Sequence, residues 1–188
     1  MTDTGVLVLT GPPCAGKSSV TRLLTAGTRC GRAVPIEVDS LFSLLLPGSD
    51  RNREDRMLAY DAAHALARLV LERGRTPLLE CTYARRDQRA GLVEALAGVP
   101  DAPVWVVEFL VSPDEAVQRF RRRDQETDLD EPLVRERAET FPYSDLGLRL
   151  HSGAADPEEL ADSIERWWRS RPGSVPRDGW VDAGKGWD

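Results

Sequence analysis

The sequence has little cysteine, no long apolar run and no excess of positive charge, and each absence narrows what the protein can be. Its cysteines, Cys14, Cys30 and Cys81, match neither a disulfide framework nor a zinc site, so we expect free thiols. No apolar run reaches the roughly 20 residues that cross a bilayer. The first residues lack the basic start of a signal peptide. We therefore expect a cytoplasmic protein without a membrane partner.

Positive charge is outnumbered by negative charge. The chain has 25 Lys and Arg against 31 Asp and Glu, which gives a formal net charge of −6. Proteins held on nucleic acid by phosphate contacts are typically basic, so the balance disfavours a nucleic-acid partner, although a local basic groove stays possible. His64 and His151 lack metal-ligand spacing and are interpreted as structural. Trp167 and Trp168 are interpreted as packing residues, because no basic surround marks a base-stacking platform.

Apolar runs of strand length alternate with helical segments along the chain. We expect strands at residues 6–9, 34–38, 77–80, 104–111 and 146–150. We expect helices at residues 17–24, 53–73, 88–96, 113–123, 132–139 and 157–168. This alternation predicts a three-layer α/β fold, in which helices cover both faces of a five-stranded, mostly parallel sheet. A chain of 188 residues suits one such domain.

Two further expectations concern the longest helix and the end of the chain. Gly74 ends the helix at 53–73. Helical spacing of its apolar residues predicts an inward face made of Met57, Leu58, Ala62, Leu66, Leu69 and Val70. Residues 171–188 are rich in Gly, Pro and Asp, so we expect a tail without regular structure.

A glycine-rich turn joins the first expected strand to the first expected helix. Its sequence, Gly-Pro-Pro-Cys-Ala-Gly-Lys-Ser, matches the phosphate-binding pattern G-x-x-x-x-G-K-[ST]. The glycines let backbone N–H groups and the helix N-terminus face phosphates. Lys17 is expected to reach the β- and γ-phosphates of ATP, and Ser18 to bind Mg²⁺. The expected nucleotide-binding residues of this segment are Gly11, Pro12, Pro13, Cys14, Ala15, Gly16, Lys17, Ser18 and Ser19.

Asp39 follows the second expected strand, at the edge where parallel sheets bind ligands. Phosphoryl transfer to a hydroxyl needs a group that orients or accepts the hydroxyl proton, and we assign this role to Asp39. The alternative is that its carboxylate caps a helix starting at Ser40. Phe42 and Arg53 belong to the segments that follow, and we expect them to contact the acceptor.

Glu80 ends the third expected strand. A carboxylate at this place can hold a Mg²⁺-bound water, as Walker B acids do, or it can be a satisfied buried acid, and both interpretations stay open. Thr82, Tyr83 and Arg85 follow, and we expect them to contact the acceptor. The alternative for the arginines of this segment is a solvated helix face.

Four arginines end the helix after the fourth strand: Arg119, Arg121, Arg122 and Arg123. A helix C-terminus favours basic side chains, which accounts for two of them. With the acidic residues 124–130, the cluster predicts a lid over about 119–140 that closes arginines onto the phosphates. We expect Arg119 and Arg123 to be catalytic, together with Lys17 and Asp39, and Arg119 and Arg122 to bind nucleotide.

These motifs resemble the P-loop kinase group that includes chloramphenicol phosphotransferase and the phage-type polynucleotide kinases. Residues 15–18 and 38–40 are similar to segments of the chloramphenicol enzyme, and this likeness also implies a base role for Asp39. Residues 80–83 and the trailing arginines resemble the strand-end D-x-T-N segment of the polynucleotide kinases, with Glu and Tyr in place of Asp and Asn. Phe42 stands where those kinases carry an Arg, which weakens the nucleic-acid interpretation.

The sequence therefore predicts a P-loop kinase domain over residues 1–170. It is expected to bind ATP and Mg²⁺ and to transfer the γ-phosphate to a hydroxyl of a small molecule, such as an antibiotic, a nucleoside or a metabolite. One alternative is a 5′-hydroxyl polynucleotide kinase. Another is a regulatory nucleotide switch, although the chain has no N-K-x-D guanine-reading motif of a GTPase.

Overall fold

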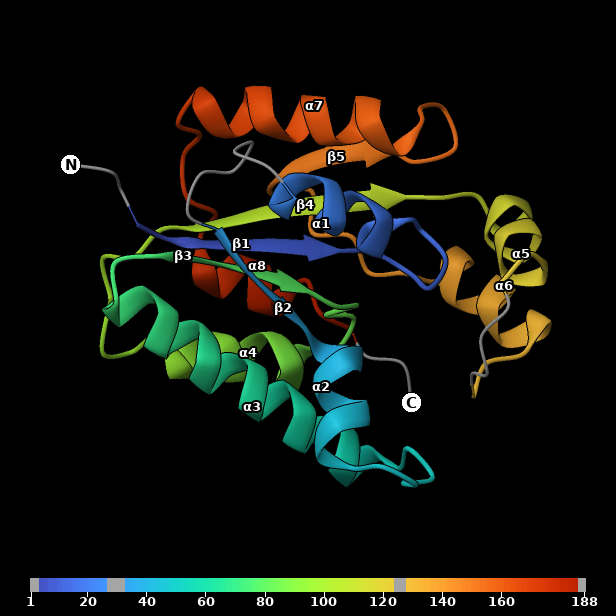
Figure 1. The fold of residues 1–188 in the computed structure, drawn as a ribbon, viewed down its shortest axis with the longest axis horizontal. Coiled ribbons are helices and arrows are strands. Elements are labelled where there is room, and N and C mark those ends of the chain that lie inside the picture. Colours follow the sequence, from blue (N-terminus) through green and yellow to red (C-terminus); the bar gives the residue numbers. More distant parts are fainter. Residues whose placement is uncertain (1–3, 27–32, 124–127, 186–188) are drawn as a thin grey trace.

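A single parallel sheet forms the centre of the molecule (Figure 1). The computed structural model describes residues 4–26, 33–123 and 128–185. Its strands are β1 (Val6–Thr10), β2 (Ala33–Glu37), β3 (Thr76–Glu80), β4 (Val104–Leu110) and β5 (Leu148–His151). Their spatial order is β2-β3-β1-β4-β5, and every pairing among them is parallel. The five-stranded α/β fold expected from the sequence is confirmed.

Helices cover both faces of this sheet, which makes three layers (Figure 1). One face carries α1 (Lys17–Thr25) and α7 (Pro157–Arg169), and the other carries α3 (Arg53–Glu72), α4 (Arg86–Ala95) and α8 (Arg177–Asp182). Beyond the carboxyl ends of the strands lie α2 (Val38–Leu45), α5 (Pro113–Arg121) and α6 (Glu131–Glu139). Within the described residues, no helix is both long and apolar enough to cross a bilayer.

The central strands β1, β3 and β4 are buried on both faces, which explains their largely apolar sequence. In β1 all residues are buried, and alternate side chains join different cores. Val6 and Val8 pack in the core beneath α3 and α4, whereas Leu7 and Leu9 pack with the core under α1 and α7. This double burial fixes the sheet firmly, so its carboxyl edge is a rigid platform for the loops that follow the strands.

The buried face of α3 differs from the predicted one. Its buried residues are Ala59, Tyr60, Ala63, His64, Ala67 and Leu71. In contrast, Leu58, Leu66 and Leu69 are 50%, 38% and 47% exposed. Alanines let the helix lie close to the sheet, and Tyr60 Oη and His64 Nε2 find partners in Thr82 and Tyr83. The prediction was wrong because it ranked side chains by apolarity and left out close approach and hydrogen bonding.

The C-terminal residues are part of the core and not an irregular tail. The side chains of Val175 and Trp180 are buried in the core beneath α3 and α4. The backbone N–H of Val175 donates to the carbonyl of Val104, with N···O 2.9 Å, and Trp180 lies within α8. The prediction of a tail without regular structure was wrong for these residues, because the Gly and Pro content masked two anchoring apolar side chains.

Candidate active site

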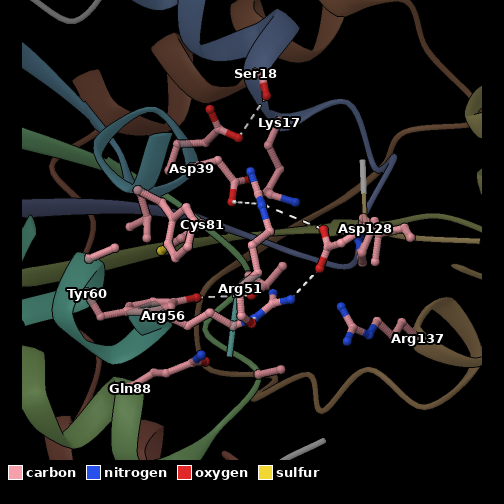
Figure 2. Close-up of a pocket in the computed structure, with 18 of the residues that line it drawn as sticks. Lys17, Ser18, Asp39, Arg51, Arg56, Tyr60, Cys81, Gln88, Asp128 and Arg137 are labelled. Atoms are coloured by element: carbon pink, nitrogen blue, oxygen red, sulfur yellow. Dashed lines mark hydrogen bonds and ion pairs between the residues drawn. The ribbon is translucent and has the colours of Figure 1, made fainter. Parts of the chain in front are cut away.

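A pocket lies at the carboxyl edge of the sheet, with a cavity volume of about 280 Å³ (Figure 2). Its walls come from the loop after β1, from α2, α3 and α6, and from the segment after β3. Because parallel strands end at the same edge, segments distant in sequence meet here. The edge is therefore where the predicted phosphate loop and Asp39 come together.

The loop between β1 and α1 has the backbone shape that a phosphate loop needs. Gly11, Cys14 and Gly16 have positive φ angles of 149°, 62° and 89°. A Cβ on Gly11 would lie 2.6 Å from the carbonyl oxygen of Phe109, so only glycine fits there. No side chain caps the N-terminus of α1, so its first N–H groups can bind an anion.

Lys17, Ser18 and Glu80 form the polar floor beside this loop. Lys17 Nζ donates to the carbonyl oxygens of Gly11 and Pro12, both at 2.9 Å. Burial lowers the pKa of Lys17, and the nearby Glu80 charge opposes that shift. Ser18 Oγ donates to Glu80 Oε1 at 2.9 Å. Burial raises the pKa of Glu80, and Lys17 and the Ser18 hydrogen bond oppose that rise.

These groups fit a magnesium nucleotide. Mg²⁺ prefers oxygen ligands and takes several of them from phosphate and water, so a hydroxyl and a nearby carboxylate are an adequate protein contribution. Ser18 and Glu80 supply such oxygens, already in contact with each other. Lys17 adds a cation at the place where a P-loop holds the β- and γ-phosphates. Glu80 is thus hydrogen-bonded at the pocket wall. This contact fits both a carboxylate that holds a Mg²⁺-bound water and a satisfied buried acid.

Asp39 lies in the first turn of α2 and on the pocket wall. The N-cap of α2 is Glu37, whose Oε2 accepts from Ser40 Oγ at 2.9 Å. The capping alternative for Asp39 is therefore wrong, because the helix starts before it. Its side chain is 95% exposed, and Arg51 Nη1 lies 3.9 Å from its Oδ1. This carboxylate is accessible to a molecule in the pocket.

Most of the residues predicted to contact the acceptor also line the pocket. Phe42 is buried, and the guanidinium carbon of Arg51 lies 4.8 Å from its ring centroid. The Thr82 hydroxyl lies 3.1 Å from Tyr60 Oη. Arg85 and Arg53 are at the same pocket, and Arg53 pairs with Asp87 at 2.9 Å on its rim.

Tyr83 does not face the pocket. Its side chain is fully buried, and its Oη lies 2.9 Å from His64 Nε2. Its φ of 45° turns the chain at this point, so the ring enters the core while Thr82 stays at the pocket. We therefore correct the expected acceptor contact. The buried His64 agrees with a structural role, and burial lowers its pKa to about 4.

Arg89, one of the arginines that trail Tyr83, is neither solvated nor in the pocket. Its guanidinium is buried and donates to three carbonyl oxygens: Tyr83 at 2.7 Å, Pro142 at 2.7 Å and Trp180 at 2.8 Å. Burial lowers its pKa to about 10. Arg89 thus joins the turn after β3 to the C-terminal residues, and neither of the sequence interpretations anticipated this role.

The arginines at the C-terminal end of α5 divide into three environments. Arg119 is tied to the protein itself, because its Nη1 donates to Cys14 O at 3.2 Å and to Ser152 Oγ at 3.0 Å. Arg123 lines the pocket. Arg121 pairs with Glu131, and Arg122 is exposed away from the pocket lining. The structure brings Arg123 to the site, uses Arg119 to brace the phosphate loop, and does not bring Arg122 there. Residues 124–127 of the expected lid lie outside the described residues.

Three residues of the predicted nucleotide segment stand apart from the lining. Ser19 is exposed on α1 and does not line the pocket. Gly11 and Pro12 are buried behind the lining, where their carbonyls hold Lys17. The remaining residues from Pro13 to Ser18 line the pocket itself.

Sequence reasoning did not single out three residues of the opposite wall, although the lid expected at about 119–140 contains two of them. Arg56, Asp128 and Arg137 line the pocket from α3, from the segment before α6 and from α6 (Figure 2). None belongs to a local motif, since each reaches the site only through tertiary packing. The charge density of residues 51–56 was the one available signal, because that segment follows Asp39 closely.

The fold and the phosphate loop together define a P-loop nucleotide-binding fold of the α/β class. The chain belongs to the AAA_33 family, an AAA domain, which matches it over residues 6–142. That match contains β1 to β4, the phosphate loop, Asp39 and both α5 and α6. Among curated protein sequences, none matches the chain.

Solved structures show the same fold at low sequence identity. A Chloroflexus aurantiacus protein, assigned only provisionally as a kinase, is 19% identical with a TM-score of 0.73, covering 91% of this chain and 100% of its own. A Janibacter sugar kinase is 16% identical with a TM-score of 0.65, covering 88% and 95%. A chain of the Pnkp1/Rnl/Hen1 RNA repair complex is 15% identical with a TM-score of 0.61, covering 77% and 46%. At these identities the likeness is one of fold.

Proposed function

We propose that the protein is an ATP-dependent kinase that transfers the γ-phosphate to a hydroxyl group of a small molecule. The observation that carries the proposal is the presence of a phosphate loop and an exposed carboxylate, Asp39, on the walls of one small cavity. A nucleotide site alone would serve a switch equally well. A base facing the same space supports transfer to a second substrate.

The proposed roles follow from position. The loop amides, the N-terminus of α1 and Lys17 bind the phosphates. Bound Mg²⁺ would neutralise charge on the phosphate oxygens, with Ser18 and Glu80 as its protein side. Asp39 orients the acceptor and takes its hydroxyl proton. Arg123 supports the transferring group, within the lid that we propose for residues about 119–140.

The acceptor is proposed to lie between α2 and the start of α3. Phe42 and Met57 supply apolar surface there, and Thr82 supplies a hydroxyl. A cavity of about 280 Å³ suits a small molecule better than a polymer segment. The name of the similar Janibacter sugar kinase supports an acceptor of this size. The free and buried Cys14 and Cys81 support our proposal of a cytoplasmic enzyme.

A screen with γ-labelled ATP tests this proposal. Purified protein is incubated with Mg²⁺ and a metabolite extract, and mass spectrometry identifies the species that gains phosphate. We expect label to move onto a small molecule, and we expect Lys17→Ala to prevent it. Slow hydrolysis that no extract accelerates would favour the regulatory switch instead.

A 5′-hydroxyl polynucleotide kinase remains the second candidate. The basic residues on the pocket wall and the fold shared with a chain of an RNA repair complex favour it. The overall charge of −6 and Phe42 at the position of an expected arginine disfavour it. We expect weak labelling of 5′-hydroxyl oligonucleotides at physiological ionic strength, and efficient, salt-sensitive labelling would reverse the ranking.

A further inference from the structure

The pocket is positively charged in a protein that is negatively charged overall. Among the described residues that line it, seven side chains are cationic and three are carboxylates, whereas the whole chain has a formal net charge of −6. The cations are Lys17, Arg51, Arg53, Arg56, Arg85, Arg123 and Arg137. The carboxylates are Asp39, Glu80 and Asp128. Such local concentration of one sign selects ligands of the other sign.

The phosphates of ATP account for only part of this charge. Lys17 directly follows Gly16 of the phosphate loop, and Arg123 lines the same pocket as that loop. Burial raises the pKa of the Cys14 thiol in the loop, and the charges of Arg123 and Lys17 oppose that rise. Arg51, Arg56 and Arg137 belong to the opposite wall, since Arg51 precedes α3, Arg56 lies in it and Arg137 lies in α6. Arg53 and Arg85 line the pocket from α3 and from the segment after β3. A pocket for ATP and a neutral acceptor would not need them.

One carboxylate of the protein already occupies this wall. Asp128 forms an ion pair with Arg56 through a direct hydrogen bond, and its Oδ1 lies 3.7 Å from Arg51 Nη1 (Figure 2). Burial acts to raise the pKa of Asp128, yet the Arg56 hydrogen bond and charge, aided by Arg51, leave that pKa lowered. The wall therefore holds an anion in its charged form.

The two arginines are held in place before any ligand arrives. Arg56 Nε donates to the carbonyl oxygen of Arg51 at 2.6 Å. The guanidinium of Arg51 lies over the Phe42 ring. A preorganised guanidinium loses little side-chain freedom when it binds an anion, which is why fixed arginines suit phosphate and carboxylate recognition.

The geometry also sets a distance between the anion site and the proposed base. Arg51 Nη1 is 3.9 Å from Asp39 Oδ1 and 3.7 Å from Asp128 Oδ1. The two carboxylate oxygens are therefore separated by no more than the sum of those distances, 7.6 Å. A molecule with its hydroxyl at Asp39 and an anionic group at Arg51 and Arg56 must carry both within a few bonds of each other.

We infer that the phosphoryl acceptor carries an anionic group, a phosphate, sulfate or carboxylate, which binds Arg51 and Arg56 in place of the Asp128 carboxylate. The inference rests on the proposed kinase function and narrows its acceptor to a small hydroxylated anion. Asp128 competes with the acceptor for the same guanidinium groups. A phosphate offers them more acceptor oxygens than the carboxylate it displaces, whereas a neutral molecule offers no replacement charge.

Calorimetric titration with inorganic phosphate tests the anion site. The nucleotide site is first saturated with Mg²⁺ and AMPPNP, so that phosphate meets only the opposite wall. We expect Arg56→Gln to weaken phosphate binding by about 10-fold or more, because a charged hydrogen-bond donor is lost. We expect Asp128→Asn to strengthen it by about 10-fold, because the competing charge is gone.

Arg68→Gln is the matched control. It removes the same charge from the same helix, but Arg68 pairs with Glu72 at 2.9 Å and does not line the pocket. We expect it to leave phosphate binding unchanged, and thermal unfolding verifies that each variant is folded. The inference is overturned if neither Arg56→Gln nor Asp128→Asn changes the phosphate affinity. It is also overturned if phosphate binds neither the native protein nor Asp128→Asn.

The γ-labelled ATP screen gives an independent readout. The inference requires that the acceptor found there carries an anionic group before it is phosphorylated, and a neutral acceptor sinks it. Preferential labelling of a 5′-hydroxyl oligonucleotide sinks it as well, because the anion would then be a polymer backbone. If no molecule in any extract gains label, the proposed function fails. The phosphate titration still decides whether the anion site exists.

Discussion

The two ends of the pocket are built in different ways. The phosphate end is one contiguous stretch, residues 11–18, which acts mainly through backbone N–H groups and the start of α1. The other end, where we propose that the acceptor binds and which we call the acceptor end, is assembled from side chains of α2, α3, α6 and the segment after β3. Phosphate groups are common to all nucleoside triphosphates, so a compact local motif is enough to bind them. An acceptor is particular to each enzyme, and its recognition is spread over the fold.

The same contrast appears in what supports each end. Arg119 braces the phosphate loop through a single contact with Cys14 O, whereas the acceptor end rests on a buried polar network. In that network Tyr60 meets Thr82, and Tyr83 meets His64. Arg89 joins the turn to the C-terminal residues. We therefore expect distant substitutions to disturb acceptor use more readily than nucleotide binding.

Asp39→Asn should give the largest effect and tests the chemical assignment of the acceptor end. The amide keeps the shape of the side chain but cannot take a proton, so we expect turnover to fall by about 10²- to 10⁴-fold. Nucleotide affinity should hardly change, because Asp39 lies outside the phosphate loop. Comparison of kcat with the AMPPNP dissociation constant checks this. Retained turnover would remove Asp39 from the chemistry.

Lys17→Ala tests the phosphate end. Loss of the cation beside the β- and γ-phosphates should lower transfer by about 10²- to 10³-fold, using the cost of one lost charge-stabilising donor as a guide. The loop should keep its fold because the positive φ angles of Gly11 and Gly16 shape it, although the carbonyl oxygens of Gly11 and Pro12 lose the hydrogen bonds that Lys17 donates. A folded Lys17→Ala protein with full activity contradicts the P-loop assignment. Circular dichroism and thermal unfolding supply the control for folding.

The sequence predicts the phosphate end far better than the acceptor end. The phosphate loop depends on neighbours in the chain, so its motif and flanking elements are enough to predict it. The apolar strands were predictable for the same local reason. Arg56 and Arg137 carry no motif, because they meet only when α3 and α6 dock beyond the sheet. Their contribution depends on tertiary packing that no local pattern encodes.

Three wrong predictions share a related physical cause. The inward face of α3 was assigned by apolarity, yet alanines near the sheet and hydrogen-bonded Tyr60 and His64 determine it. Tyr83 was expected at the pocket, and its positive φ directs it into the core. The C-terminal tail was expected to be irregular, and Trp180 anchors it. In each case a specific buried contact outweighs the average tendency of the composition.

The pH dependence of the free energy of unfolding tests the buried polar network that supports the acceptor end. Burial lowers the pKa of His64 to about 4, against about 6.5 in an unfolded chain. The unfolded state therefore binds a proton first as the pH falls. The contribution of the uncharged His64 to the free energy of unfolding is complete above about pH 6.5 and declines toward pH 4, by about 3 kcal/mol in total. Denaturant unfolding at pH 7 and pH 4.5 measures this decline.

Two histidine variants isolate the effect. His64→Phe keeps a ring against Tyr83 but cannot titrate, so its stability should depend less on pH between 6.5 and 4. His151→Gln removes the exposed histidine and should leave the dependence of the native protein unchanged. We further expect the acceptor KM to rise at low pH before nucleotide affinity does, because Tyr83 adjoins Thr82. Equal pH dependence in His64→Phe and the native protein assigns the decline to other groups.

Glu80→Gln should have the smallest effect and tests the boundary between the two ends. Glu80 accepts a hydrogen bond from Ser18 and ends β3, so it belongs to both walls. If its carboxylate orients Mg²⁺-bound water, its loss should weaken the apparent affinity for Mg²⁺ by about 10- to 100-fold, the usual cost of losing an outer partner of a metal. Turnover at saturating Mg²⁺ should largely recover, because glutamine still accepts from Ser18.

The native protein should show a related pH effect. Burial raises the pKa of Glu80, so this carboxylate takes up a proton at a higher pH than an ordinary carboxyl does. As the pH falls, the Mg²⁺ concentration that the native protein requires should therefore begin to rise at a higher pH. Mg²⁺ titrations of activity at several pH values measure both effects. An unchanged Mg²⁺ requirement combined with lower stability would make Glu80 a satisfied buried acid, and the phosphate end would then hold its metal through Ser18 alone.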